Sequence, residues 1–162
     1  MGQYHVLVNL DKKEYVMPHH VGDGLKLWEW SGDGMLRAMQ VLLATSNGRG
    51  GGDLPDNKVV GRWGGDRVAV IGDYSEVGDI KSKPKLDPKK IYEFCDYKAK
   101  GGWKNISNMV VPVLEEVGEF KMDKTDGWQH RKYRNETQAE KPRMAIDMVV
   151  GPDGIQTNVK TR

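Results

Sequence analysis

Hydrophobic and polar positions in the first residues of the chain predict a β-hairpin. Residues 4–10 are rich in β-branched and aromatic side chains, which is typical of a strand. A turn at 11–13 leads into a second extended segment at 14–17. Pro18 ends this segment, because proline has no amide hydrogen to donate to a sheet. The two segments are therefore expected to pair.

An amphipathic helix is predicted over residues 34–46. Its apolar side chains recur at helical spacing on one face: Met35, Leu36, Met39, Leu42 and Leu43. Ser31 or Asp33 is expected to cap the N-terminus by accepting a hydrogen bond from a free amide. Asn47 and Gly48 are expected to supply the left-handed residue that ends the helix.

Three further regular elements follow from the pattern. Residues 67–71 predict a strand that is apolar enough to be central in a sheet. Residues 107–117 predict a second helix, capped by Asn105 or Ser107, which either starts near Asn108 or bends at Pro112. Residues 144–150 predict a last strand, which a Gly-Pro-Asp-Gly turn closes before a frayed or extended end.

The remaining segments are polar or ambiguous. Residues 25–30 fit a helical turn or a strand, and residues 90–97 fit a helix or a strand. Segments near 78–90 and 123–143 are expected to be polar loops or arms. The order of elements predicts an α+β fold with a mainly antiparallel sheet and two packing helices. A chain of 162 residues is expected to form a single domain, residues 1–162.

Composition places the protein in a reducing compartment. The chain has one cysteine, Cys95, which cannot form an intramolecular disulfide, so a cytoplasmic location is expected. The first residues lack the pattern of a signal peptide. The longest mostly apolar run, residues 109–114, is too short to span a bilayer, so no membrane association is expected.

The segment 47–73 combines glycine with fixed charge and is the strongest candidate for a ligand-binding site. Glycine allows close approach of a ligand to the backbone, and arginine contacts phosphate or carboxylate groups. Aromatic side chains stack on bases or sugars. The ligand-binding residues predicted from this pattern are Arg49, Asp53, Arg62, Trp63, Asp66 and Arg67.

A structural interpretation of the same segment stands beside the functional one. Residues 47–53 are then a flexible loop after a helix. Residues 61–67 are then a glycine-rich turn, in which Trp63 covers the edge of the core and Asp66 pairs with an arginine. The order strand, glycine loop, helix that cradles phosphate in P-loop and dinucleotide folds is absent from the segment.

Other constellations offer weaker candidates. A metal site could use His19, His20, Asp23 and Asp73, although adjacent histidines on a strand point to opposite faces. Cys95 has apolar neighbours and fits a buried structural thiol. Lysines at 81–90 and basic residues at 130–134 fit either a nucleic-acid surface or a solvated one. No cofactor is expected, and the pattern favours binding over catalysis.

Parts of the first half, up to Tyr74, resemble a family of small uncharacterised proteins of bacteria and their phages. The resemblance lies in the initial Met-Gly-Gln-Tyr and in residues 8–14, 18–19, 22–27, 46–53 and 61–67. It implies no activity. It implies a tie to mobile genetic elements, whose small proteins often bind a host factor, a nucleic acid or a signalling nucleotide.

These observations lead to a functional hypothesis. The chain is expected to be a small cytoplasmic binding protein of phage or mobile-element type, without catalysis. Its ligand would be anionic: nucleic acid, a nucleotide or an acidic surface of a host protein. Replacing Arg62 and Trp63 together by alanine should then abolish binding without unfolding the protein. A metal-dependent phosphoesterase-type hydrolase is the alternative and a virion or assembly component the third option; the oligomeric state stays open.

Overall fold

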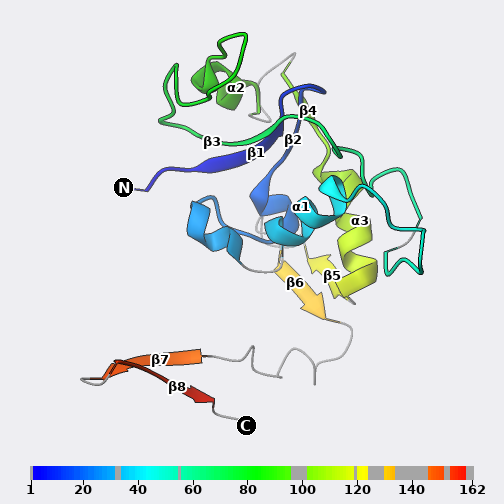
Figure 1. Cartoon of the computed structure of the whole chain (residues 1–162), viewed down its shortest axis with the longest axis vertical. Helices are drawn as coiled ribbons and strands as arrows, with labels where there is room; N and C mark the ends of the chain where they lie inside the picture. The colour runs from blue at the N-terminus through cyan, green and yellow to red at the C-terminus, as the bar shows by residue number, and fades with distance from the viewer. Residues whose placement is uncertain are drawn as a thin grey trace.

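A four-stranded sheet forms the centre of the fold (Figure 1). In the computed structural model, β1 (His5–Asn9) pairs antiparallel with β2 (Glu14–Val16) and with β3 (Val68–Gly72), and β2 pairs parallel with the short β4 (Lys104–Asn105). The fold is therefore α+β, as predicted, with a mixed rather than purely antiparallel sheet. The structure describes residues 2–31, 34–54, 56–95, 102–118, 120–123, 130–133, 146–151 and 154–159.

The predicted N-terminal hairpin is confirmed, whereas the predicted place of the next strand is wrong. The β1–β2 register places Leu7 opposite Val16 and Asn9 opposite Glu14. In the strand order β3-β1-β2-β4, however, β3 lies at the edge of the sheet and not at its centre. Its apolar sequence is explained by a helix packed on one of its faces, because an edge strand covered on one face also needs apolar residues there.

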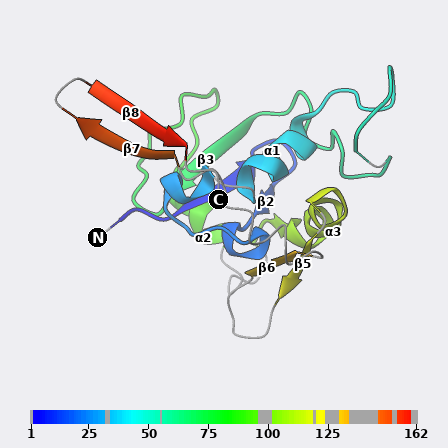
Figure 2. The ribbon, with the colours of Figure 1, turned by 90° about the horizontal axis from the view of Figure 1, so that it is seen from below.

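Helices cover both faces of the sheet. α1 (Met35–Leu43) and α3 (Ser107–Gly118) lie on one side, seen from below in Figure 2, and α2 (Pro88–Phe94) lies on the other. Side chains alternate between the two faces of a strand. Leu7 therefore packs in the core with α1 and α3, whereas its neighbours on β1 pack with α2. The two predicted helices are thus present. α2 is a third helix, which begins just before the ambiguous segment 90–97 and extends into it.

Contacts with residues distant in the sequence determine where α1 begins and ends. The Oδ2 atom of Asp23 accepts a hydrogen bond of 2.6 Å from the amide of Met35. The predicted cap by Ser31 is wrong, since the Ser31 hydroxyl donates to the carbonyl of Trp28; Asp33 lies outside the described residues. Two short 3-10 helices, Pro18–Val21 and Leu27–Ser31, precede α1.

The C-terminal end of α1 is capped by residues 61–67, the glycine-rich segment. The carbonyl of Val41 accepts from the amide of Gly61, and the carbonyl of Leu42 accepts from the amide of Trp63, both at 2.8 Å. Ala44 then takes an extended conformation, with φ −61° and ψ 127°. The predicted termination by Asn47 and Gly48 is therefore wrong: the helix ends earlier, because a distant segment supplies donors to its last carbonyls.

α3 runs without interruption past Pro112. Asn105 accepts a hydrogen bond of 2.9 Å from the amide of Ser107, which confirms Asn105 as a capping residue. The Ser107 hydroxyl in turn accepts from the amide of Met17 at 2.9 Å and ties the helix to the end of β2. Pro112 lies on the exposed side of the helix, where the missing hydrogen bond faces water rather than the core.

Two antiparallel strand pairs follow in the second half of the chain. β5 (Phe120–Asp123) pairs with β6 (His130–Tyr133), and β7 (Ile146–Gly151) pairs with β8 (Gly154–Val159). The predicted last strand is thus confirmed, and the end expected to be frayed or extended contains β8. β6 lies inside the segment 123–143, for which a polar loop or arm is predicted, and its pairing with β5 corrects that part of the prediction. The other residues of the segment after Asp123 lie outside the described ones.

The close approach of Gly61 to α1 generates a stability prediction. Gly61 has φ +76°, and an added Cβ would lie 2.5 Å from the carbonyl oxygen of Ala44. Gly65 shares the positive φ, +83°, but an added Cβ would meet nothing within 4 Å. We expect Gly61→Ala to lower the free energy of unfolding by about 2 kcal/mol or more, and Gly65→Ala by only about 1 kcal/mol. Urea unfolding of both variants measures the difference, and equal losses would contradict it.

Candidate functional site

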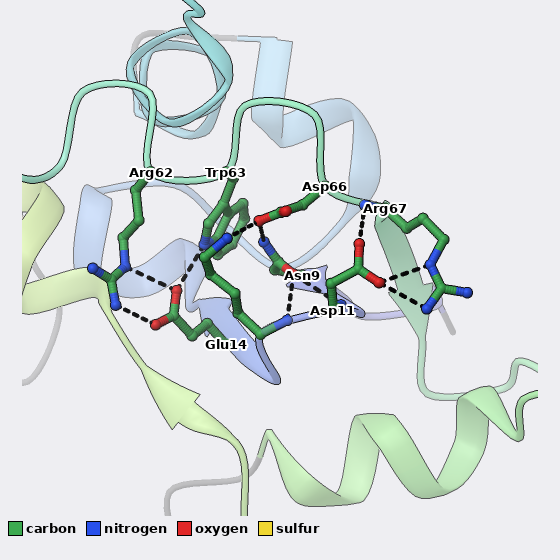
Figure 3. A network of polar contacts seen from close by, with 8 residues as sticks. Asn9, Asp11, Glu14, Arg62, Trp63, Asp66 and Arg67 are labelled. Carbon is green, nitrogen blue, oxygen red and sulfur yellow. Dashed lines mark hydrogen bonds and ion pairs between the residues drawn. The ribbon is translucent and has the colours of Figure 1, made fainter.

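The charged side chains of residues 61–67 bind the turn of the β1–β2 hairpin (Figure 3). Three pairs cross between the two segments: Arg62 with Glu14, Asp66 with Lys12, and Arg67 with Asp11. Each cation or anion of the glycine-rich segment therefore meets an opposite charge from the hairpin.

Glu14 is the buried member of this network. Its side chain is only 5% exposed. Its Oε2 atom accepts hydrogen bonds from Arg62 Nε at 3.0 Å and from Trp63 Nε1 at 2.8 Å, and Arg62 Nη2 contacts its other oxygen. Burial raises the pKa of Glu14, but the hydrogen bonds from Arg62 and Trp63 outweigh burial and hold this pKa below its ordinary value. The hydrogen bond to Glu14 also raises the pKa of Arg62.

Asn9 shapes the hairpin turn that carries the other two pairs. Its Oδ1 atom accepts from the amides of Asp11 and Lys12 at 2.9 and 2.8 Å. Its Nδ2 atom donates to Asp66 at 2.8 Å, so one side chain joins the turn to the glycine-rich segment. Hydrogen bonding by Lys12 lowers the pKa of Asp66. The backbone hydrogen bond from Arg67, followed by its guanidinium, lowers the pKa of Asp11.

This geometry contradicts the predicted stacking role of Trp63. The Trp63 side chain is fully buried in the core with α1 and α3, so its ring cannot stack on a ligand. Replacing Arg62 and Trp63 together by alanine would open the core and leave Glu14 buried without partners. We therefore expect this double variant to lose stability, in contrast to the expectation from the sequence. The structural interpretation of residues 61–67, in which Trp63 packs against the core, agrees better with the burial of this side chain. In that interpretation Asp66 pairs with an arginine, whereas in the structure it pairs with Lys12.

A pocket lies beside this network, and most of its lining residues belong to the segment 47–73. Its volume is about 330 Å³, and it opens between the end of α1 and the segment that caps it. The residues that line it are Ala44, Thr45, Ser46, Asn47, Gly48, Asp56, Asn57, Val60, Gly61 and Gly64. None of the six predicted ligand contacts is among them, neither Arg49 and Asp53 nor Arg62, Trp63, Asp66 and Arg67, so residues other than the predicted ones line the pocket.

Two asparagine side chains hold the walls of the pocket. Asn47 donates to the carbonyl of Leu54 at 2.6 Å and accepts from its amide at 3.4 Å, which closes the loop between them. Asn57 accepts from the amides of Val59 and Val60 at 2.8 and 3.1 Å. Because each asparagine replaces backbone pairing with side-chain hydrogen bonds, these loops keep a defined shape without regular secondary structure.

Arg49 differs from the other predicted cations. It lies in the exposed loop after Gly48, and its Nε atom donates to the hydroxyl of Ser46, a lining residue, at 3.3 Å. Among the described residues no carboxylate forms an ion pair with it. Asp53 is exposed in the same loop. Of the six predicted residues, Arg49 is therefore the cation that stands next to the pocket.

The residues of the alternative metal site are held in separate contacts. His19 Nδ1 lies 3.1 Å from the carbonyl of Asp23, and His20 Nδ1 lies 3.3 Å from Asn105 Nδ2. The Asp23 carboxylate caps α1, and Asp73 accepts from the amide of Tyr4. Within the described ranges, no three histidine, cysteine, aspartate or glutamate side chains gather in a group that could hold a metal ion.

Cys95 is buried, and its burial raises the pKa of the thiol to about 12. The thiolate, which is the nucleophilic form, is therefore scarcely populated at neutral pH. This agrees with the interpretation of Cys95 as a structural residue.

Comparisons with known proteins add no family to this description. Neither family models, nor curated proteins, nor solved structures match the chain. In the part of the chain that the structure describes, no helix has the length and apolar character needed to cross a membrane.

Sequence reasoning missed the hairpin as the partner of the glycine-rich segment. The turn Asp11-Lys12-Lys13-Glu14 carries both signs of charge, as does the segment 61–67. This charge complementarity was the signal in the sequence that could have indicated the contact between the two segments. It could not indicate which of several charged segments pair, because residues 11–14 and 62–67 are about 50 positions apart in the chain.

Glu14→Gln tests the buried network. At neutral pH we expect a loss of about 2–3 kcal/mol in the free energy of unfolding, because the partly buried Arg62 loses its counter-charge. The folded-state pKa of Glu14 is lowered, so its stabilisation is present above the ordinary pKa of 4.5 and disappears as the pH falls through the folded-state value. The difference between the two proteins should therefore shrink in acid.

Urea unfolding at a series of pH values measures this effect. Glu76→Gln, at an exposed acid, is the matched control and should unfold like the unmodified protein. A gap between Glu14→Gln and the unmodified protein that stays constant down to the acid limit of folding would contradict the assignment.

Proposed function

We propose that this chain is a non-catalytic binding protein that holds a small anionic ligand of nucleotide size in the pocket at the end of α1. The observation that carries the proposal is the position of Arg49. Its guanidinium contacts Ser46 at the pocket, and no described carboxylate neutralises it, in contrast to Arg62 and Arg67.

The size and polarity of the pocket support a small hydrophilic ligand. A volume of about 330 Å³ lies at the lower end of the range of small-molecule sites, roughly 300–1,000 Å³. Five of the ten lining residues are threonine, serine, asparagine or aspartate. Glycines 50 and 51, in the loop that carries Arg49, have positive φ and open space around them, so the loop leaves room for a ligand to approach.

The charges around the pocket indicate how such a ligand would lie. The carboxylate of Asp56 gives the wall to which it belongs negative character. Hydroxyl or amino groups of the ligand would therefore face this wall. Its phosphate would face Arg49, because hydrogen bonds between a guanidinium and an anion are strong. A nucleotide carries both kinds of group.

The lining also supports binding rather than reaction. Thr45 and Ser46 offer hydroxyl groups, but no histidine or lysine stands among the lining residues to activate them. The resemblance of the first half to bacterial and phage proteins supports a role on a mobile genetic element as part of the same proposal. The single cysteine supports a cytoplasmic location.

Titration calorimetry with AMP, adenosine and inorganic phosphate tests this proposal. We expect the unmodified protein to bind AMP more tightly than adenosine. Arg49→Gln should weaken AMP binding by about 10- to 100-fold, the worth of hydrogen bonds to a charged group, and should leave adenosine binding unchanged.

Arg67→Gln is the matched control, because it removes a guanidinium that binds Asp11 and does not line the pocket. It should bind AMP like the unmodified protein. The proposal fails if the unmodified protein binds neither AMP nor phosphate, or if the control loses affinity while Arg49→Gln keeps it.

A further inference from the structure

The outer side of β3 offers backbone groups at Val68 and Val70 that no described residue pairs with. In the antiparallel pair with β1, the amide of Leu10 donates to the carbonyl of Arg67, and the amide of Asp73 donates to the carbonyl of Tyr4. Hydrogen-bonded positions alternate along such a pair, so Val68 and Val70 direct their amides and carbonyls away from β1. No described strand pairs with this side, since β3 is the edge of its sheet.

The side chains near this edge are unusually apolar and exposed. Val70 is 40% exposed, and Tyr74, just beyond the strand, is 67% exposed. Edge strands usually carry a charge or proline within them that prevents pairing with another chain. Here Val68–Gly72 contains neither, and its charges stand at the two ends, with Arg67 before the strand and Asp73 after it.

We propose that β3 pairs with β3 of a second copy of this chain, antiparallel and about a two-fold axis at Val70. In this register the two Val70 residues face each other and exchange both backbone hydrogen bonds. Val68 stands opposite Gly72 of the second copy. The two four-stranded sheets then form one continuous sheet across the interface.

Charge complementarity selects the second copy and its register. With Val70 on the axis, Arg67 of each chain stands opposite Asp73 of the other, which creates two cross-strand ion pairs. Shifting the axis by one residue, to Ala69 or Ile71, also matches the outward backbone groups but places Arg67 opposite Ile71 or Ser75. The side chain of Arg67 is 50% exposed even with Asp11 bound, so it can reach across the axis. Opposite charges across strands stabilise pairing, and like charges oppose it.

The pairing requires one local adjustment. The amide of Gly72 donates to the hydroxyl of Ser75 at 3.0 Å, and the amide of Ser75 donates to the carbonyl of Gly72 at 3.1 Å. In the dimer the Gly72 amide would exchange the hydroxyl for the carbonyl of Val68 in the second copy. A carbonyl oxygen accepts two hydrogen bonds, so the Ser75 amide keeps its acceptor.

Sedimentation velocity over a range of protein concentrations measures the association. We expect the unmodified chain to shift from monomer to dimer as concentration rises. Val70→Lys should weaken dimerisation by about tenfold or more, because a charge is placed on the axis opposite its own copy. Leu36→Lys is the matched control, at a residue of α1 that is 48% exposed, and should dimerise normally.

A mixing experiment tests the register. Arg67→Glu alone and Asp73→Lys alone each create like-charge pairs across the axis and should stay monomeric. An equimolar mixture of the two variants should form a heterodimer, because every cross-strand pair is then attractive. If Arg67→Glu unfolds because it faces Asp11, the added change Asp11→Lys restores an internal pair of opposite charges, without the hydrogen bond that Asp11 accepts from the amide of residue 67.

Three results would overturn the proposal. They are a monomeric unmodified chain at every concentration, a Val70→Lys variant that dimerises like the control, and a mixture that does not associate although both variants are folded by circular dichroism.

Discussion

The buried carboxylate of Glu14 is the contact on which the arrangement of this protein depends. One side chain at the start of β2 accepts hydrogen bonds from the Arg62 guanidinium and from the indole of Trp63. A carboxylate can remain ionised in such a place only if strong donors replace the water it has lost. Both donors come from the glycine-rich segment, so the ionisation of Glu14 and the position of that segment depend on each other.

The same segment ends α1, and the pocket is a consequence of this double role. Gly61 and Trp63 donate their amides to the last carbonyls of the helix, while the adjacent side chains bind the hairpin. Glycine is required at position 61 because the backbone passes within contact distance of Ala44 with positive φ. The chain leaving α1 and the chain returning to cap it leave a space between them, and the asparagine-closed loops form its walls.

This organisation explains why several residues that composition singled out as ligand contacts serve a structural purpose. Glycine, arginine and tryptophan together are typical of ligand-binding loops, but they also suit a segment that must approach a helix closely, carry counter-charges and bury a ring. Trp63 and Arg62 serve the second purpose. Arg49 forms no ion pair with a carboxylate among the described residues and stays a candidate for the first.

The local sequence pattern predicted some of the elements of this protein. β-branched and aromatic side chains predict the N-terminal hairpin. Apolar side chains spaced three and four apart predict α1 and α3, because this spacing follows from helix geometry within a few residues. Tertiary structure alone decided that Asp23 caps α1, that β3 lies at an edge, and that Glu14 holds Arg62 and Trp63. Those contacts join residues 12 to 67 positions apart. Opposite charges and free amides are common along the chain, so only the folded arrangement selects which of them meet.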